Sequence, residues 1–174
     1  FVPFTFVGNH DVTRIASRLN DIRHLPHVLT LLFLLGGTPC VYSGDEQGFR
    51  GIKEDRAGGD DAVRPAFPDS PESLSPDGWT IYRLHQDLIG LRRRNPWLVR
   101  ARSETLHLDN RQMVIRVSAE GNRLVIALNL GDDEARLPVG DANGVLMGSG
   151  GVLDRNGSSA IIDLKSHGWA VLSS

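Results

Sequence analysis

The first half of the chain places two short apolar runs on either side of a strongly apolar helical segment. Residues 4–7 and residues 38–43 are rich in the aromatic and β-branched side chains that favour strands. Between them, residues 28–35 are apolar nearly all round, which predicts a helix buried on more than one side and stopped by the two following glycines. Pro26 is tolerated only in a first helical turn, so we expect the regular helix to begin there.

The segment after the second predicted strand is long and irregular before a further helix. Residues 45–78 are rich in Gly, Pro and Asp, and a loop of this length is typical of a functional or a disordered segment. Residues 79–94 then repeat apolar side chains at helical spacing. The resulting order of strand, helix, strand, loop and helix predicts a parallel sheet.

After Pro96 the pattern changes to short strands separated by turn residues. We expect strands near residues 104–109, 113–117, 124–128, 134–138, 144–147, 160–164 and 168–172. Many short strands with turn punctuation predict an antiparallel β-sandwich. The chain is therefore predicted to contain an α/β domain in residues 1–95 and an all-β domain in residues 96–174.

The composition excludes some classes of function. The chain of 174 residues is 40% hydrophobic and 23% charged, with a formal net charge of −2. This balance is ordinary for a globular protein and gives no electrostatic reason to expect nucleic acid or an anionic membrane as a partner. Cys40 is the single cysteine, so an internal disulfide is excluded, and the histidines lack the spacing of metal ligands. We expect no metal and no cofactor.

A polar cluster follows the first predicted strand. Asn9, His10 and Asp11 would lie at the carboxyl end of a parallel strand, where α/β barrels assemble their sites. Asp11 offers a fixed negative charge, and Asn9 could hold either neighbour by hydrogen bonds. The same three residues also make a good turn and helix entry, so the cluster alone does not establish a site.

Two motifs together resemble a known family. The stretch Phe-Val-Gly-Asn-His-Asp at residues 6–11 is followed, about 26 residues later, by Gly-Thr-Pro-Cys-Val-Tyr-Ser-Gly-Asp-Glu at residues 37–46. This pair is similar to the α-amylase family of glycoside hydrolases, in which such segments form the seventh and eighth strands of a (β/α)8 barrel. The resemblance implies that the chain is the final quarter of a TIM barrel followed by a C-terminal antiparallel β-sandwich.

The resemblance also implies roles for three residues. Asp11 would be the carboxylate that stabilises the transition state, and His10 would bind the same sugar. Residues 60–67 are similar to a loop after the eighth strand, which makes Arg64 a candidate substrate contact, with a plain surface arginine as the equal alternative. In that family the nucleophile and the acid/base lie on earlier strands. We expect them upstream of Phe1, and we expect the isolated chain to be inactive.

Three further charged residues have simpler expected roles. Asp45 and Glu46 are adjacent at a strand end and would point to opposite faces, which is poor geometry for flanking one bond. We interpret them as structural residues that tie the loop to the barrel. Arg14 is expected either to position carboxylates or to be a solvated charge at a helix entry.

The predicted function is that of a retaining glycosidase acting on α-glucosidic bonds of starch-derived oligosaccharides or related α-glucosides. The alternatives are a transglycosylase or isomerase of the same family, for example for trehalose- or sucrose-type linkages, and a non-catalytic carbohydrate-binding or structural module. Expected partners are an α-glucan substrate and either the missing N-terminal part of the barrel or a second copy, because a quarter barrel has open edges. The opening residues do not resemble a signal peptide, which favours the cytoplasm without deciding the compartment.

Overall fold

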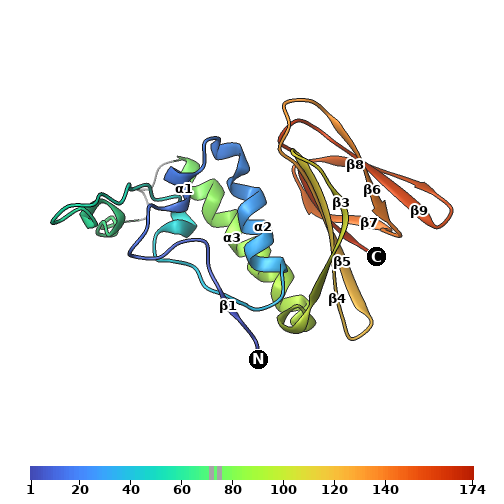
Figure 1. The fold of residues 1–174 in the computed structure, drawn as a ribbon, viewed down its shortest axis with the longest axis horizontal. Coiled ribbons are helices and arrows are strands. Elements are labelled where there is room, and N and C mark those ends of the chain that lie inside the picture. The colour runs from blue at the N-terminus through green and yellow to red at the C-terminus, as the bar shows by residue number, and fades with distance from the viewer. Residues whose placement is uncertain (71–72, 74–75) are drawn as a thin grey trace. The chain divides into compact units, whose positions relative to one another are not determined.

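The structure is a computed structural model that describes residues 1–70, 73 and 76–174 (Figure 1). The chain divides into two compact units, which are treated separately below. The helical unit comprises Pro3–Phe33 and Thr38–Arg94, and the β unit comprises Asn95–Ser174 with Phe1–Val2 and Leu34–Gly37. The division into domains 1–95 and 96–174 stays a prediction. Within the described part of the chain, every helix is too short or too polar to cross a membrane.

The helical unit contains two very short strands and three α-helices. Its elements are β1 (Phe4–Thr5), α1 (Ile15–Arg18), α2 (Leu25–Leu34), β2 (Thr38–Pro39) and α3 (Pro76–Arg94), with single 3-10 turns at Ile22–His24, Asp45–Gln47 and Asp61–Val63. The strands β1 and β2 are parallel, with Phe4 opposite Thr38. This pairing confirms the parallel arrangement that the strand–helix–strand pattern predicts.

Both strands are shorter than predicted, because only a few backbone hydrogen bonds join them. The N–H of Thr38 donates to the carbonyl of Pro3 at 2.8 Å, and the N–H of Cys40 donates to the carbonyl of Thr5 at 2.8 Å. The side chains of Phe4 and Phe6 remain 65% and 52% exposed, which is the open-edge exposure expected of an isolated strand pair. Self-association of the lone chain through such surfaces stays a prediction.

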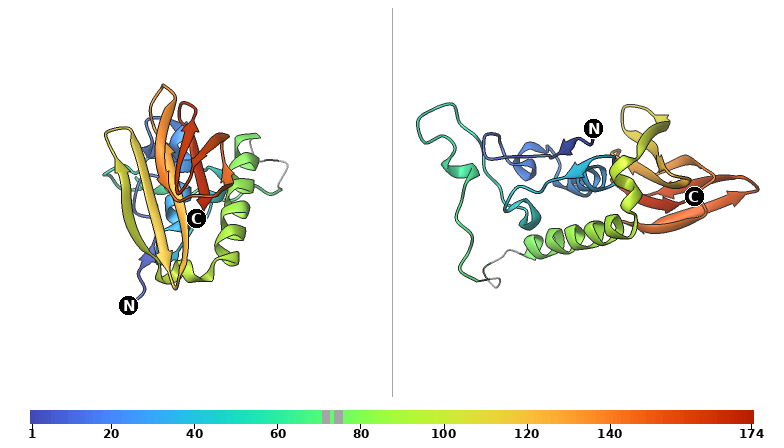
Figure 2. Two further views of the ribbon diagram at one scale, coloured as in Figure 1. Left: turned by 90° about the vertical axis from the view of Figure 1, so that its right-hand side faces the viewer. Right: turned by 90° about the horizontal axis from the view of Figure 1, so that it is seen from below.

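The helices begin and end close to the predicted positions. α2 starts one residue before Pro26, after a turn in which Oδ1 of Asp21 accepts from the N–H of Arg23 at 2.9 Å. As predicted, the apolar side chains of this helix are largely buried (Leu29, Leu32, Phe33 and Leu34). α3 starts three residues before the predicted position and runs as one long helix to Arg94 (Figure 2).

The β unit is an antiparallel sandwich of two sheets. Its strands are β3 (Arg102–Leu108), β4 (Gln112–Ala119), β5 (Asn122–Asn129), β6 (Ala135–Gly140), β7 (Gly144–Gly148), β8 (Gly151–Asn156), β9 (Ser159–Leu164) and β10 (Trp169–Ser173). One sheet has the order β3-β4-β5-β10-β7, and the other has the order β6-β9-β8 (Figure 1). All their pairings are antiparallel.

A single apolar core lies between these two sheets. Val114, Val125 and Leu172 come from the five-stranded sheet, and Leu137 and Ile162 from the three-stranded sheet, all fully buried in one cluster. Strand β6 alternates buried and exposed positions along its length, as a strand with one face on a core must. Strand β8 was not predicted, because it lies at a sheet edge and its residues are mostly exposed.

Candidate active site

The three residues predicted for the site converge in the structure. Nε2 of His10 lies 3.3 Å from Oδ2 of Asp11. Arg64, 53 residues further along the chain, places Nη2 at 3.4 Å from Oδ1 of Asp11 and donates from Nε to the carbonyl of His10 at 3.3 Å. All three side chains are about half exposed or more, so the cluster can meet a ligand.

Local hydrogen bonds hold this cluster in place. Oδ1 of Asn9 accepts from the backbone N–H of Asp11 at 2.8 Å, as the polar sequence Asn-His-Asp suggested. Oδ2 of Asp60 lies 2.5 Å from Nη2 of Arg64, which therefore contacts two carboxylates. The sequence reasoning missed Asp60, although its position four residues before Arg64 was a usable signal for an ion pair.

A buried ion pair joins the segments that carry the exposed cluster. Nη1 of Arg14 donates to Oδ1 of Asp45 at 2.9 Å, and both side chains are only 2% exposed. The guanidinium also donates from Nε to the carbonyl of Val63 at 3.1 Å and stacks 4.4 Å from the ring centre of Tyr42. Arg14 is therefore not a solvated charge. It ties the segment that carries Asp11 to the residue preceding Arg64.

The loop after β2 is also bonded to the segment around α1. The carbonyl of Gly51 accepts from the N–H of Arg14 at 3.0 Å, and the N–H of Gly51 donates to Oγ of Ser17 at 3.0 Å. The N–H of Lys53 donates to Oγ1 of Thr13 at 3.0 Å. Backbone and side-chain bonds of this kind fix one loop against another, so Asp11 and Arg64 are held on connected supports.

Asp45 and Glu46 have the structural roles expected of them. Burial raises the pKa of Asp45, with the Arg14 guanidinium acting in the opposite direction. Its Oδ2 has no partner among the described residues, and a Cβ on Gly8 would lie 3.1 Å from it. Glu46 accepts from the N–H of Gly44 and from Nε2 of Gln47, both at 2.9 Å. Neither carboxylate joins the exposed cluster.

Chemically, the cluster combines a carboxylate with two directional donors. Asp11 can accept hydrogen bonds from hydroxyl groups and can stabilise a developing positive charge. His10 and Arg64 can donate to hydroxyl or carboxylate oxygens. A site with these groups suits a neutral, hydroxyl-rich ligand.

The comparisons with known proteins identify the family. Residues 2–103 match the model of the alpha amylase catalytic domain. The chain belongs to the alpha-amylase family.

Its relatives include transferases and a hydrolase. A 4-alpha-glucanotransferase of Thermotoga neapolitana is 30% identical over 162 residues, covering 77% of this chain and 36% of the relative. A cyclomaltodextrin glucanotransferase of Bacillus sp. (strain 38-2) is 28% identical over 160 residues, covering 87% of this chain and 20% of the relative. A maltogenic alpha-amylase of Bacillus acidopullulyticus is 34% identical over 96 residues, covering 55% of this chain and 15% of the relative. The chain thus spans about a third or less of the length of these relatives.

Solved structures establish the fold. An alpha-amylase from H. orenii superimposes with a TM-score of 0.81 at 19% identity, covering 100% of this chain and 40% of that one. A debranching enzyme from Nostoc punctiforme gives a TM-score of 0.81 at 21% identity, covering 99% of this chain and 36% of that one. The fold is that of the C-terminal part of an alpha-amylase-family barrel followed by the β-sandwich domain.

Proposed function

We propose that the chain is the C-terminal part of a retaining enzyme that cleaves α-glucosidic bonds in starch-derived oligosaccharides or related α-glucosides. The observation that carries the proposal is the convergence of His10, Asp11 and Arg64 in one exposed cluster. The match to the alpha amylase catalytic domain supports the assignment of these residues to a glycosidic site.

In this proposal Asp11 acts on the transition state. Cleavage of a glycosidic bond develops positive charge on the sugar ring, and a fixed carboxylate interacts more strongly with that charge than with the neutral ground state. Arg64 contacts the side-chain carboxylate of Asp11, and Asn9 accepts a hydrogen bond from its backbone N–H, so both hold Asp11 in place. His10 and Arg64 donate hydrogen bonds to hydroxyl groups of the same sugar.

The proposed chemistry needs two further carboxylates. A retaining glycosidase uses a nucleophile and an acid/base roughly 5 Å apart on either side of the bond. Asp60 is paired with Arg64, and Asp45 is buried against Arg14, so neither is available as such a residue. We propose that both groups come from residues upstream of Phe1 and that this chain alone does not turn over α-glucosides.

A second candidate function is transfer of the glucosyl chain to a sugar acceptor. Two of the relatives described above are a 4-alpha-glucanotransferase and a cyclomaltodextrin glucanotransferase, which favours this alternative. A non-catalytic carbohydrate-binding module is less well supported. Residues 95–174 hold two tryptophans and no phenylalanine or tyrosine, and one of the two, Trp169, is only 6% exposed.

The experiment compares this chain with the complete polypeptide to which it belongs, using maltooligosaccharides and chromatography of the products. We expect turnover only by the complete polypeptide. In it, Asp11→Asn should lower kcat by roughly 10²–10³-fold or more, because a charged group aimed at the transition state is lost. Hydrolysis gives only products shorter than the substrate, whereas transfer gives a shortened donor together with a product longer than the substrate.

The control is Asp55→Asn, which removes an exposed carboxylate from the same region of loop. It should leave kcat unchanged. Turnover by the isolated chain would refute the proposed division of the catalytic residues. Wild-type activity of Asp11→Asn would refute the role of Asp11.

A further inference from the structure

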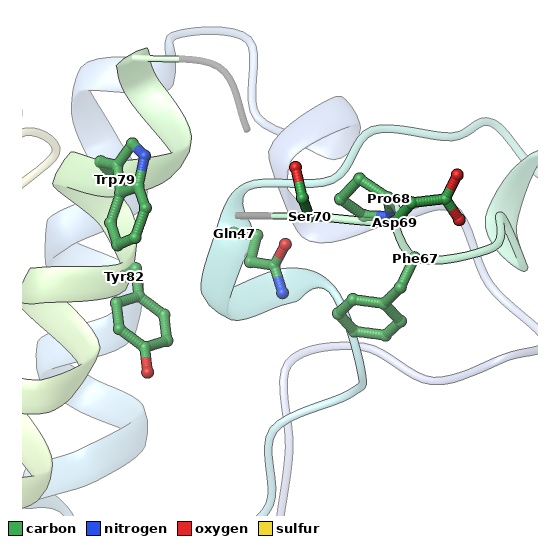
Figure 3. A pocket seen from close by; sticks show the side chains of 7 residues that line it. All are labelled: Gln47, Phe67, Pro68, Asp69, Ser70, Trp79 and Tyr82. Atoms are coloured by element: carbon green, nitrogen blue, oxygen red, sulfur yellow. The ribbon is translucent and has the colours of Figure 1, made fainter. Parts of the chain in front are cut away.

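A cavity lies in the helical unit, and its lining does not include His10, Asp11 or Arg64. It has a volume of about 330 Å³. Trp79 and Tyr82 of α3 line one wall, and Phe67 lies across from them on the loop that follows Arg64 (Figure 3). Gln47 and Asp69 also line the cavity. A volume of a few hundred Å³ with several aromatic side chains and a few polar groups is typical of a site for a small ligand.

Two of the aromatic side chains of this cavity are partly exposed to solvent. Phe67 is 49% exposed and Trp79 is 39% exposed. The ring of Trp79 meets that of Tyr82 edge to face at 5.9 Å, and Phe67 packs against Phe49 at 5.5 Å. Neighbouring rings therefore support both walls, while their remaining faces are left to solvent. Adjacent exposed apolar groups that are rimmed by polar residues are a feature of ligand-binding grooves.

The polar lining indicates the chemistry of the ligand. Asp69 offers two acceptor oxygens, Gln47 offers a donor and an acceptor, and Ser70 can act as either. The described lining contains no lysine or arginine, and the Asp69 carboxylate repels anions. The cavity is therefore unsuited to phosphates and nucleotides. It suits a neutral ligand with several hydroxyl groups and an apolar C–H face.

A pyranose ring has both of these features. The weakly positive axial C–H groups on one face of the ring can lie against the negative face of an aromatic ring. Its hydroxyl groups can meanwhile exchange hydrogen bonds with Gln47, Asp69 and Ser70.

We propose that this cavity is an accessory site for a glucosyl unit of an α-glucan, separate from the Asp11 cluster. The assignment of the sugar class rests on the proposed function. The site would hold one part of a glucan chain by its C–H face while another part reaches the reactive centre. It takes part in no bond cleavage.

The test is calorimetric titration of the purified 174-residue chain with maltotriose, on the wild type and on single variants. Saturable binding is expected, and both Trp79→Ala and Phe67→Ala should weaken it by about tenfold, since each removes one stacking surface. Asp69→Asn should weaken it less and keep the cavity's shape. Circular dichroism of each variant separates lost binding from lost folding, and the partly exposed positions make loss of folding unexpected.

Two controls separate this site from the catalytic proposal. Asp55→Asn, at an exposed carboxylate outside the cavity lining, should bind maltotriose as the wild type does, and Trp97→Phe should also be unaffected. If both Trp79→Ala and Phe67→Ala bind like the wild type, or if the wild type shows no saturable binding, the accessory site is refuted. The catalytic proposal is judged separately by turnover of the complete polypeptide. Binding without any such turnover would refute the catalytic proposal and leave a sugar site here.

The choice of sugar has its own test. Cellotriose has the same hydroxyl groups as maltotriose but β-linkages, and glucose 6-phosphate adds a charge. Weaker binding of both than of maltotriose is expected. Equal binding of cellotriose would overturn the assignment to α-glucans, and tighter binding of the phosphate would overturn the assignment to neutral sugars.

Discussion

The two units of this chain are stabilised in different ways. The β unit encloses a continuous apolar core between two antiparallel sheets, with residues such as Leu137 and Ile162 fully buried. The helical unit has a strand pair of two residues each, leaves Phe4 and Phe6 exposed, and places the Arg14–Asp45 ion pair in its interior. The β unit thus buries one apolar core between its sheets, whereas the helical unit combines buried apolar side chains with a buried ion pair that also positions a site.

The largest effect is expected from breaking the buried ion pair of the helical unit. Arg14→Met leaves the Asp45 carboxylate buried without a counterion, which typically costs about 3–5 kcal/mol. It also removes the hydrogen bond to the carbonyl of Val63, so the backbone next to Arg64 loses a fixed contact. The measurement is urea unfolding of the chain, followed by circular dichroism.

Two comparisons make this prediction specific. Arg56→Met disrupts an exposed ion pair with Glu54 and should cost less than about 1 kcal/mol. The double variant Arg14→Met/Asp45→Asn removes both charges and should lose less stability than the sum of its single variants. Additive losses would show that the two residues do not act as a pair.

The next largest effect is expected from the apolar core of the β unit. Leu137→Ala removes a fully buried side chain and leaves a cavity, which costs about 2–5 kcal/mol. Leu108→Ala makes the same chemical change at a side chain that is 66% exposed and should cost little. Unfolding monitored by the fluorescence of the buried Trp169, with Trp79 and Trp97 replaced by phenylalanine, reports on this unit. Equal losses for the two variants would contradict the assigned core.

The sequence predicted the β unit better than it predicted the site. The pairing of β4 with β5 follows from two apolar runs of strand-forming residues and a turn at Glu120 and Gly121, which take positive φ values of 55° and 79°. Such signals are local, because a hairpin is made by residues close in sequence. Strand β8 lacked them, since an exposed edge strand carries few apolar side chains.

The site depended on contacts that are distant in sequence. A family resemblance indicated Asp11, His10 and Arg64 as candidates, but the contact of Arg64 with Asp11 across 53 residues is visible only in the structure. The pair between Arg14 and Asp45 spans 31 residues, and nothing in either local sequence indicates that both are buried. Long-range electrostatic pairing has no periodicity that a sequence pattern can reveal.

The smallest effect concerns a titratable group within the helical unit. His85 of α3 is 2% exposed, its Nδ1 lies 2.9 Å from the carbonyl of Ile81, and its ring meets that of Phe33 at 5.6 Å. Burial lowers the pKa of His85, and this effect outweighs the hydrogen bond to Ile81 and the charge of Glu46. The folded state therefore binds a proton less readily than the unfolded state.

The sign of the pH dependence follows from this difference. Well above the ordinary histidine pKa of 6.5 both states are neutral at this position, and its contribution to stability is fully present. As the pH falls below 6.5, protonation favours the unfolded chain, so the free energy of unfolding decreases. Measured by urea unfolding at pH 7.5 and pH 5.5, the wild type should lose more stability on acidification than His85→Leu. Gln86→Leu, at an exposed position of the same helix, should match the wild type, and equal losses for all three proteins would show that His85 titrates as it does in water.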